Sequence, residues 1–208
     1  MDKKQFTKGK GRGPKKSKVY GFGINDVGSP TVWADEETGK SVYCPYYYRW
    51  KEMLKRCYSD LYHERRPTYK DCTVVEEWKT FSNFRKWMVQ QDWEGMDLDK
   101  DLKVMGNKVY GPEACLFIPR AVNTLFGVAG AGSSPYPIGV TFIRRSKKKP
   151  FMARLRIDGV HKHLGCYPTP EEAAKVYVKA RNEYLRSKAE EYPQYATYIL
   201  ARLIKGDD

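Results

Sequence analysis

Three aspartates stand at alternate positions near the middle of the chain, at Asp97, Asp99 and Asp101. In a β-strand alternate side chains project from the same face, so this spacing predicts three carboxylates side by side. Carboxylate oxygens suit Mg²⁺ or another divalent cation, and a metal held in this way can activate water and stabilise the leaving oxygen of a phosphodiester. The alternative is that the acids only solvate an exposed strand beside Lys100 and Lys103.

A turn and a short helix follow the aspartates and must position the rest of such a site. Gly106-Asn107 is a turn signal, and the apolar residues up to Phe126 predict a short helix that carries Asn123. The turn can bring Glu113 and Asn123 back towards the acids. The sequence therefore predicts oxygen ligands from separate segments gathered around one cation.

Residues 98–123 form a longer pattern of four short motifs. The motifs read Leu98-Asp99-Lys100-Asp101, Gly106-Asn107, Tyr110-Gly111-Pro112-Glu113-Ala114-Cys115 and Asn123. This pattern resembles the core of phage-encoded endonucleases of the HNH type. The spacing of large apolar residues from Trp50 to Trp87 resembles what precedes that core, so the resemblance spans roughly residues 43–126.

The resemblance implies an α+β domain of the HNH nuclease type and a role for each matched residue. It implies that Asp99 or Asp101 binds the metal together with Asn123, that Lys100 lies near the scissile phosphate, and that Glu113 positions water. The histidine that acts as general base in HNH enzymes is absent, and Lys100 or Asp101 stands in its place.

The net charge of +13 is concentrated in two regions. Residues 1–18 hold eight Lys or Arg against one acid, and residues 137–188 hold 13 against four, whereas residues 19–136 are close to neutral. Basic regions on either side of an acidic site suit a polyanion, because neutralised phosphates release counterions. The expected partner is double-stranded DNA, and the alternative is a merely solubilising surface.

Length, cysteines and hydropathy bound the remaining possibilities. A chain of 208 residues with 41% hydrophobic content suffices for one large or two small domains. Five cysteines without a CxxC pair disfavour a disulfide framework and a zinc knuckle, so Cys57, Cys72 and Cys115 are expected in the core. There is neither a membrane-length apolar run nor a signal-peptide core, so we expect no membrane partner and a cytoplasmic location, in the host cell if a phage encodes the protein. The oligomeric state stays open.

The segments before the acidic stretch predict an arm and a helical core. Residues 1–18 predict a disordered basic arm, and residues 19–126 a domain that opens with one or two strands and a hairpin over 20–43. Helical spacing predicts helices over 45–58 and 75–91, separated by a loop over 61–72. In that loop Arg65 and Arg66 are candidate phosphate contacts, and His63 is expected to face solvent rather than to act as a base.

The sequence after residue 126 predicts a second, smaller domain. A Gly- and Ser-rich linker at 127–136 is followed by strands over 138–143, 151–157 and 160–167, the last two joined by an Asp158-Gly159 turn. Thr169-Pro170 then predicts a helix start. The domain covers residues 137–188, and residues 189–208 predict a C-terminal helix that packs on the central domain or offers an oligomer contact.

The second domain carries matched motifs in a fixed order. They are Gly139-Val140, Phe151 to Arg156, Leu164-Gly165 and Thr169 to Ala174. This order resembles the plant ethylene-response-factor DNA-binding domain of the APETALA type, in which a three-stranded antiparallel sheet packed on one helix enters the major groove. By position the resemblance implies DNA contacts from Arg156, Arg154 and Arg144, and Lys162 lies on the third strand. Arg145, Lys147 and Lys148 in the basic turn are further candidate DNA contacts. His161 and His163 alternate on the third strand, either as ordinary strand residues or as a metal pair.

Two functions follow from these patterns. The leading one is a metal-dependent DNA endonuclease of the phage homing type that binds duplex DNA through its C-terminal sheet. The competing one is a catalytically inactive DNA-binding regulator or architectural protein built on a nuclease-derived fold.

Overall fold

The computed structural model describes residues 18–35, 37–126 and 134–204. The chain divides into two compact units, residues 1–118 and 119–208, and the class is mixed α+β, as predicted. The predicted arm at 1–18 lies outside the described residues except for Lys18, and so does most of the predicted linker. The helix that carries Asn123 belongs to the second unit.

The first unit is built from short strands and helices around an aromatic core. They are β1 (Val32–Ala34), β2 (Ser41–Tyr43), α1 (Pro45–Tyr58), α2 (Asp60–Arg65), η1 (Pro67–Tyr69), β3 (Thr73–Val74), η2 (Glu76–Lys79), α3 (Phe81–Met88), β4 (Met96–Asp99), β5 (Val109–Tyr110) and β6 (Leu116–Pro119). β1 and β2 form the predicted antiparallel hairpin. β3 pairs with β5 in parallel, and β4 pairs with β6.

Helix α1 confirms the helix predicted over 45–58. Pro45 stands in its first turn, where a missing N–H breaks no helical hydrogen bond, and Ser59 ends the helix in an extended conformation. The indole N–H of Trp50 donates to the carbonyl of Trp78 at 2.7 Å, which satisfies its polar group inside the core. As predicted, the buried face consists of Trp50, Met53, Leu54 and Cys57.

The prediction of a single helix over 75–91 is wrong, because the helix is interrupted at Thr80, which separates η2 from α3. Thr80 is extended, and the backbone there pairs with the segment around Ile24. Phe81 N donates to Ile24 O at 2.9 Å, and Ser82 N donates to the Asp26 carboxylate at 2.9 Å. Asp26 thus caps α3 from a distant part of the chain, which helical periodicity does not reveal.

The prediction of a loop over 61–72 is also wrong in part, because α2 and η1 occupy most of that segment. Ser59 caps α2 by accepting a hydrogen bond from Tyr62 N at 3.3 Å. Pro67 opens η1 and stops α2 two residues earlier. These short turns lead the chain from α1 to β3.

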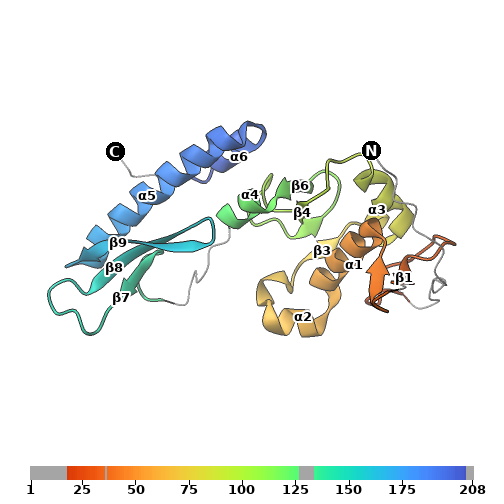
Figure 1. Ribbon diagram of the computed structural model, residues 1–208, viewed down its shortest axis with the longest axis horizontal. Helices are drawn as coiled ribbons and strands as arrows, with labels where there is room; N and C mark the ends of the chain where they lie inside the picture. The colour runs from red at the N-terminus through yellow and green to blue at the C-terminus, as the bar shows by residue number, and fades with distance from the viewer. Residues whose placement is uncertain (1–17, 36, 127–133, 205–208) are drawn as a thin grey trace. The chain divides into compact units, whose positions relative to one another are not determined.

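The second unit contains a three-stranded antiparallel sheet packed on one long helix (Figure 1). Its order β7-β8-β9 and helix confirm the predicted arrangement. The turn between β8 and β9 has positive φ at Asp158 and Gly159, as a two-residue hairpin turn requires. The elements are α4 (Arg120–Leu125), β7 (Val140–Phe142), β8 (Phe151–Ile157), β9 (Val160–Tyr167), α5 (Pro170–Glu191), η3 (Pro193–Tyr195) and α6 (Ala196–Leu200).

Local signals fix where the helix and the first strand begin. Thr169 caps α5 by accepting from Glu172 N at 3.2 Å, as the sequence predicts. Strand β7 is shorter than the predicted 138–143, since Gly139 precedes it with φ +81°. A Cβ at this glycine would collide with the ring of Tyr177 on α5. Gly139 therefore allows sheet and helix to approach closely.

The tip of the β8–β9 hairpin is tied to α5 by an ion-pair cluster. The Asp158 carboxylate accepts from the Tyr184 hydroxyl at 2.9 Å and lies 3.2 Å from Lys188 Nζ. Lys188 also pairs with Glu191 at 2.8 Å. The hydrogen bonds from Tyr184 and Lys188 lower the pKa of Asp158. The hydrogen bond to Glu191, followed by that to Asp158, raises the pKa of Lys188.

The tail after α5 packs against that helix through α6. The Asn182 amide is buried and bonds both the N–H and the carbonyl of Ile204, each at 3.0 Å. The tail therefore completes the second unit. No helix among the described residues is both long and apolar enough to span a membrane.

Candidate functional site

The three aspartates do not form one strand face, because β4 ends at Asp99. Asp97 pairs with Arg49 of α1 at 3.8 Å, and the same arginine donates to the Met96 carbonyl at 2.6 Å. Asp101 lies in the bend after the strand. The prediction of alternate carboxylates along one strand is wrong beyond Asp99, since the chain turns there.

The Asp99 carboxylate causes that turn. Its Oδ1 accepts the N–H of Asp101 at 2.9 Å and the N–H of Leu102 at 2.6 Å. Burial raises the pKa of this carboxyl, and the nearby Asp101 charge adds to the rise, against the two backbone hydrogen bonds. Among the described residues these two N–H groups are its only hydrogen-bond donors, so its second oxygen, Oδ2, is available to a ligand. A half-buried carboxylate with a raised pKa is a common mark of a functional site.

Lys100 is a buried cation enclosed by the same bend. It is 6% exposed, and its Nζ donates to Asp101 Oδ2 at 2.7 Å and to the Asn107 carbonyl at 2.5 Å. The rings of Tyr69 and Tyr110 lie 5.9 Å from the ammonium. The ammonium group is therefore engaged by protein groups, which favours a structural role for Lys100 over contact with a phosphate.

The other predicted members of the acidic site are Glu113 and Asn123. Glu113 is exposed, and its carbonyl accepts from Lys103 Nζ at 3.0 Å. Asn123 lies on α4 in the second unit, as the predicted short helix requires. Within the described part of the chain no three His, Cys, Asp or Glu side chains gather closely enough for a metal ion. Asp99 and Asp101 remain as oxygen donors, and Mg²⁺ can be held by one or two carboxylates together with water.

The cysteines beside this bend are core residues, as predicted. Cys57, Cys72 and Cys115 are at most 3% exposed. Burial raises the pKa of the Cys57 and Cys115 thiols to about 12 and also raises that of Cys72. Neutral thiols of this kind are poor metal ligands.

The basic residues of the predicted 61–72 loop lie at the end of α2. Arg65 and Arg66 are exposed and can meet a phosphate. His63 is partly buried instead of facing solvent, and its Nε2 lies 2.9 Å from the carbonyl of Arg56 near the end of α1. The imidazole thus has a local role in joining α2 to α1.

The second unit presents a basic sheet face that α5 does not cover, called the open face below. Ala153 and Leu155 are buried, whereas Arg154 and Arg156 between and after them are exposed. This alternation confirms that both arginines point away from the helix. The carbonyl of Gly159 in the hairpin turn accepts from Arg156 Nε at 3.1 Å and orients that guanidinium.

Strand β9 adds two histidines to the open face. In the antiparallel register Arg154 pairs with His163 and Arg156 with His161, so the four side chains share this face. His161 and His163 are exposed, and His163 Nε2 lies 3.5 Å from Cys166 Sγ. Sequence reasoning treated the histidines only as strand residues or metal ligands. Their alternate spacing opposite two arginines was the available signal.

Lys162 lies on the other side of the sheet. It pairs with Leu155, whose side chain is buried on the helix side. The strand pleat therefore separates this lysine from Arg154 and Arg156.

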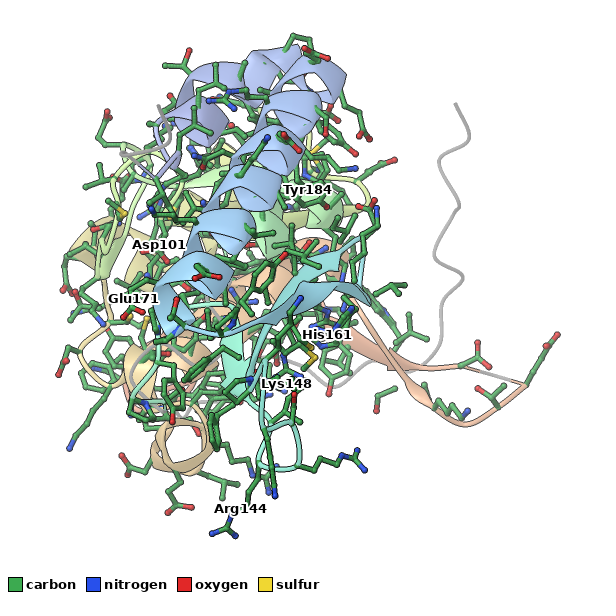
Figure 2. All side chains as sticks on the ribbon, turned by 90° about the vertical axis from the view of Figure 1, so that its left-hand side faces the viewer. Asp101, Arg144, Lys148, His161, Glu171 and Tyr184 are labelled. Carbon is green, nitrogen blue, oxygen red and sulfur yellow. The ribbon has the colours of Figure 1, made fainter. Side chains whose placement is uncertain are left out.

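The β7–β8 loop brings further cations to one end of the sheet. Figure 2 shows Arg144 and Lys148 in this loop, with Arg144 projecting away from the sheet. The predicted contacts Arg144, Arg145, Lys147 and Lys148 are all exposed. This loop and the open face provide cations suited to a polyanion.

Comparison of the chain with known protein families, with curated proteins and with solved structures finds no match.

Proposed function

We propose that the protein binds duplex DNA through the open face of the β7-β8-β9 sheet. The observation that carries the proposal is the pair of arginines, Arg154 and Arg156, held on the face opposite the helix with a histidine beside each. The major groove of B-DNA admits a two-stranded β-ribbon, which β8 and β9 form here, and arginine forms bidentate hydrogen bonds with guanine. The resemblance of the matched motifs to a DNA-binding domain supports the same reading.

The test compares two substitutions that remove the same charge from opposite sides of the sheet. Arg156→Ala should weaken binding at a preferred duplex site by about 1 to 3 kcal/mol and relax the preference there. Lys162→Ala should leave the preference intact. Affinities on specific and random duplexes, measured by fluorescence anisotropy at fixed salt, provide the readout. Equal losses for the two variants on both duplexes would contradict the proposal.

A metal-dependent DNA endonuclease activity is the second candidate, with Mg²⁺ or another divalent cation at Asp99 and Asp101. The position of Asp99 favours this candidate, because its Oδ1 holds two backbone N–H groups of the bend and leaves Oδ2 available to a cation. The metal would supply an activated water and charge stabilisation of the leaving oxygen. Glu113 as the group positioning water belongs to this candidate, whereas the contacts of Lys100 assign it to support of the bend.

Plasmid nicking separates the endonuclease from the alternative of a protein that only binds DNA. Asp99→Asn retains an oxygen for the two backbone N–H groups but loses the charge that attracts the metal. This variant should stop Mg²⁺- or Mn²⁺-dependent nicking and keep DNA affinity. Asp97→Asn, on the same strand but paired with Arg49, is the matched control and should still cut. A wild-type protein that binds DNA without cutting it under either metal would leave DNA binding as the function.

A further inference from the structure

A patch of three aromatic rings lies at the end of the sheet in the second unit, and we call it the aromatic patch. The ring centroid of Phe142 lies 5.9 Å from that of Tyr136 and 5.5 Å from that of Phe151. Tyr136 and Phe142 are stacked with an interplanar angle of 24°. Phe142 is nevertheless 45% exposed, so part of its ring remains available to a ligand.

The strand pleat places this patch on the helix side of the sheet. Val140 and Phe142 flank Thr141 and therefore project together, and Val140 is buried with Ala153 and Ala173. Phe142 extends the same face to the end of the strand, where it is exposed. A duplex bound to the open face by Arg154 and Arg156 would lie on the opposite side of the sheet from the patch.

The β7–β8 loop borders the patch with positive charge. It leaves β7 after Phe142 and returns to Phe151, and Ile143 N donates to Pro150 O at 2.7 Å across its base. The Ser146 hydroxyl donates to the Lys149 carbonyl at 2.9 Å within it. Arg144 follows Phe142 by two residues, and Lys149 precedes Phe151 by two residues. Two residues of extended chain span at most about 7 Å, so each end of the loop has a cation close to an aromatic residue. The exposed cations are Arg144, Arg145, Lys147, Lys148 and Lys149.

We propose that the aromatic patch and the β7–β8 loop form a binding site for single-stranded nucleic acid. An unpaired base stacks on the exposed part of Phe142, and the neighbouring phosphates contact the loop cations. Stacking on aromatic side chains beside a cationic groove is the general mode of single-strand binding, and it needs no particular base. A base inside a duplex is already stacked on its neighbours and offers no free face to the ring. The aromatic patch lies on a different face of the sheet from Arg154 and Arg156, so the site goes beyond the duplex-binding proposal.

The test measures the affinity of the full chain for a labelled oligothymidine of about 12 nucleotides, an oligouridine of the same length and a random duplex. Phe142→Leu retains an apolar side chain but removes the aromatic face. It should weaken binding to the single strand by about 5-fold or more and change duplex binding by less than about 2-fold. Phe142→Trp should restore single-strand binding. The two oligonucleotides show whether DNA, RNA or both are bound.

Val160→Ala is the matched control, because Val160 is an exposed apolar residue of the same sheet at 71% exposure and lies outside the patch. It should change neither affinity. Thermal melting verifies that Phe142→Leu folds, which is expected of a half-exposed position. Unchanged single-strand affinity in Phe142→Leu would overturn the proposal, as would equal losses on single strand and duplex. A change in oligomeric state without a change in affinity would assign the patch to self-association instead. If the open face proves not to bind duplex DNA, the single-strand test still stands, because Phe142 lies on the other face of the sheet.

Discussion

Lys100 in the first unit and Arg154 in the second are both cations beside a sheet, but their surroundings differ. Lys100 is enclosed by two tyrosine rings and hydrogen-bonded to Asp101 and the Asn107 carbonyl. Arg154 is exposed on the sheet face that α5 does not cover. A buried charge must be paired within the protein, because desolvation is costly, whereas an exposed charge can meet a ligand. The first unit uses its central cation for structure, whereas the second leaves its cations exposed, where a partner can reach them.

The apolar cores of the two units differ in the same sense. The first unit buries large aromatic residues, with Trp50, Trp78, Phe81 and Phe84 at most 1% exposed. The sheet of the second unit packs on α5 mainly through smaller residues such as Val140, Ala153 and Ala173. We therefore expect stability of the first unit to depend on packing and that of the second to depend more on its polar contacts.

The largest expected effect sharpens this comparison of cores. Trp50→Ala should destabilise the first unit by about 3 to 5 kcal/mol, the usual cost of truncating a buried large aromatic side chain. All five tryptophans lie before residue 94, so tryptophan fluorescence in a denaturant titration reports on the first unit alone. Trp50→Phe should lose less. Equal losses in the two variants would argue against a tightly packed core at this position.

The next effect tests whether Lys100 supports the bend. Lys100→Ala removes hydrogen bonds to Asp101 and to the Asn107 carbonyl and should cost about 1.5 to 3 kcal/mol of unfolding free energy. The matched control is Lys103→Ala, because Lys103 is exposed and makes one hydrogen bond, to the Glu113 carbonyl. Denaturant titration compares the two variants. A stable Lys100→Ala protein that has lost only nuclease activity would return Lys100 to the catalytic role predicted from the sequence.

A smaller effect concerns the polar tie in the second unit. The pKa of Asp158 is lowered in the folded protein by hydrogen bonds from Tyr184 and Lys188. Its stabilisation is therefore fully present above the unfolded pKa of about 3.9 and is lost as the pH falls through the lower folded value. Asp158→Asn should remove this dependence while retaining the left-handed turn, which asparagine tolerates. NMR signals of α5 and β8 followed in acid provide the measurement. A variant with the wild-type acid response would mean that another group governs it.

Local signals in the sequence determined much of the fold. Pro45 with apolar residues at helical spacing predicted α1, and the Asp158-Gly159 pair and the Thr169-Pro170 start predicted the hairpin and helix of the second unit. Alternation along β8 also predicted which face carries Arg154 and Arg156. These features depend on residues close together in sequence, and their physical causes are capping, turn geometry and the strand pleat.

Tertiary structure decided the rest, because it depends on contacts between distant segments. Pairing with Ile24 and capping by Asp26 break the helix predicted over 75–91, and neither contact has a local signal. The strand of aspartates ends at Asp99 because its carboxylate binds the following backbone N–H groups. Enclosure of Lys100 by Tyr69 and Tyr110 requires segments 31 residues before it and 10 after it to meet at one bend. Residue types therefore indicated the candidate sites. Burial and pairing in the tertiary structure decided which charged groups stabilise the fold and which are exposed to a partner.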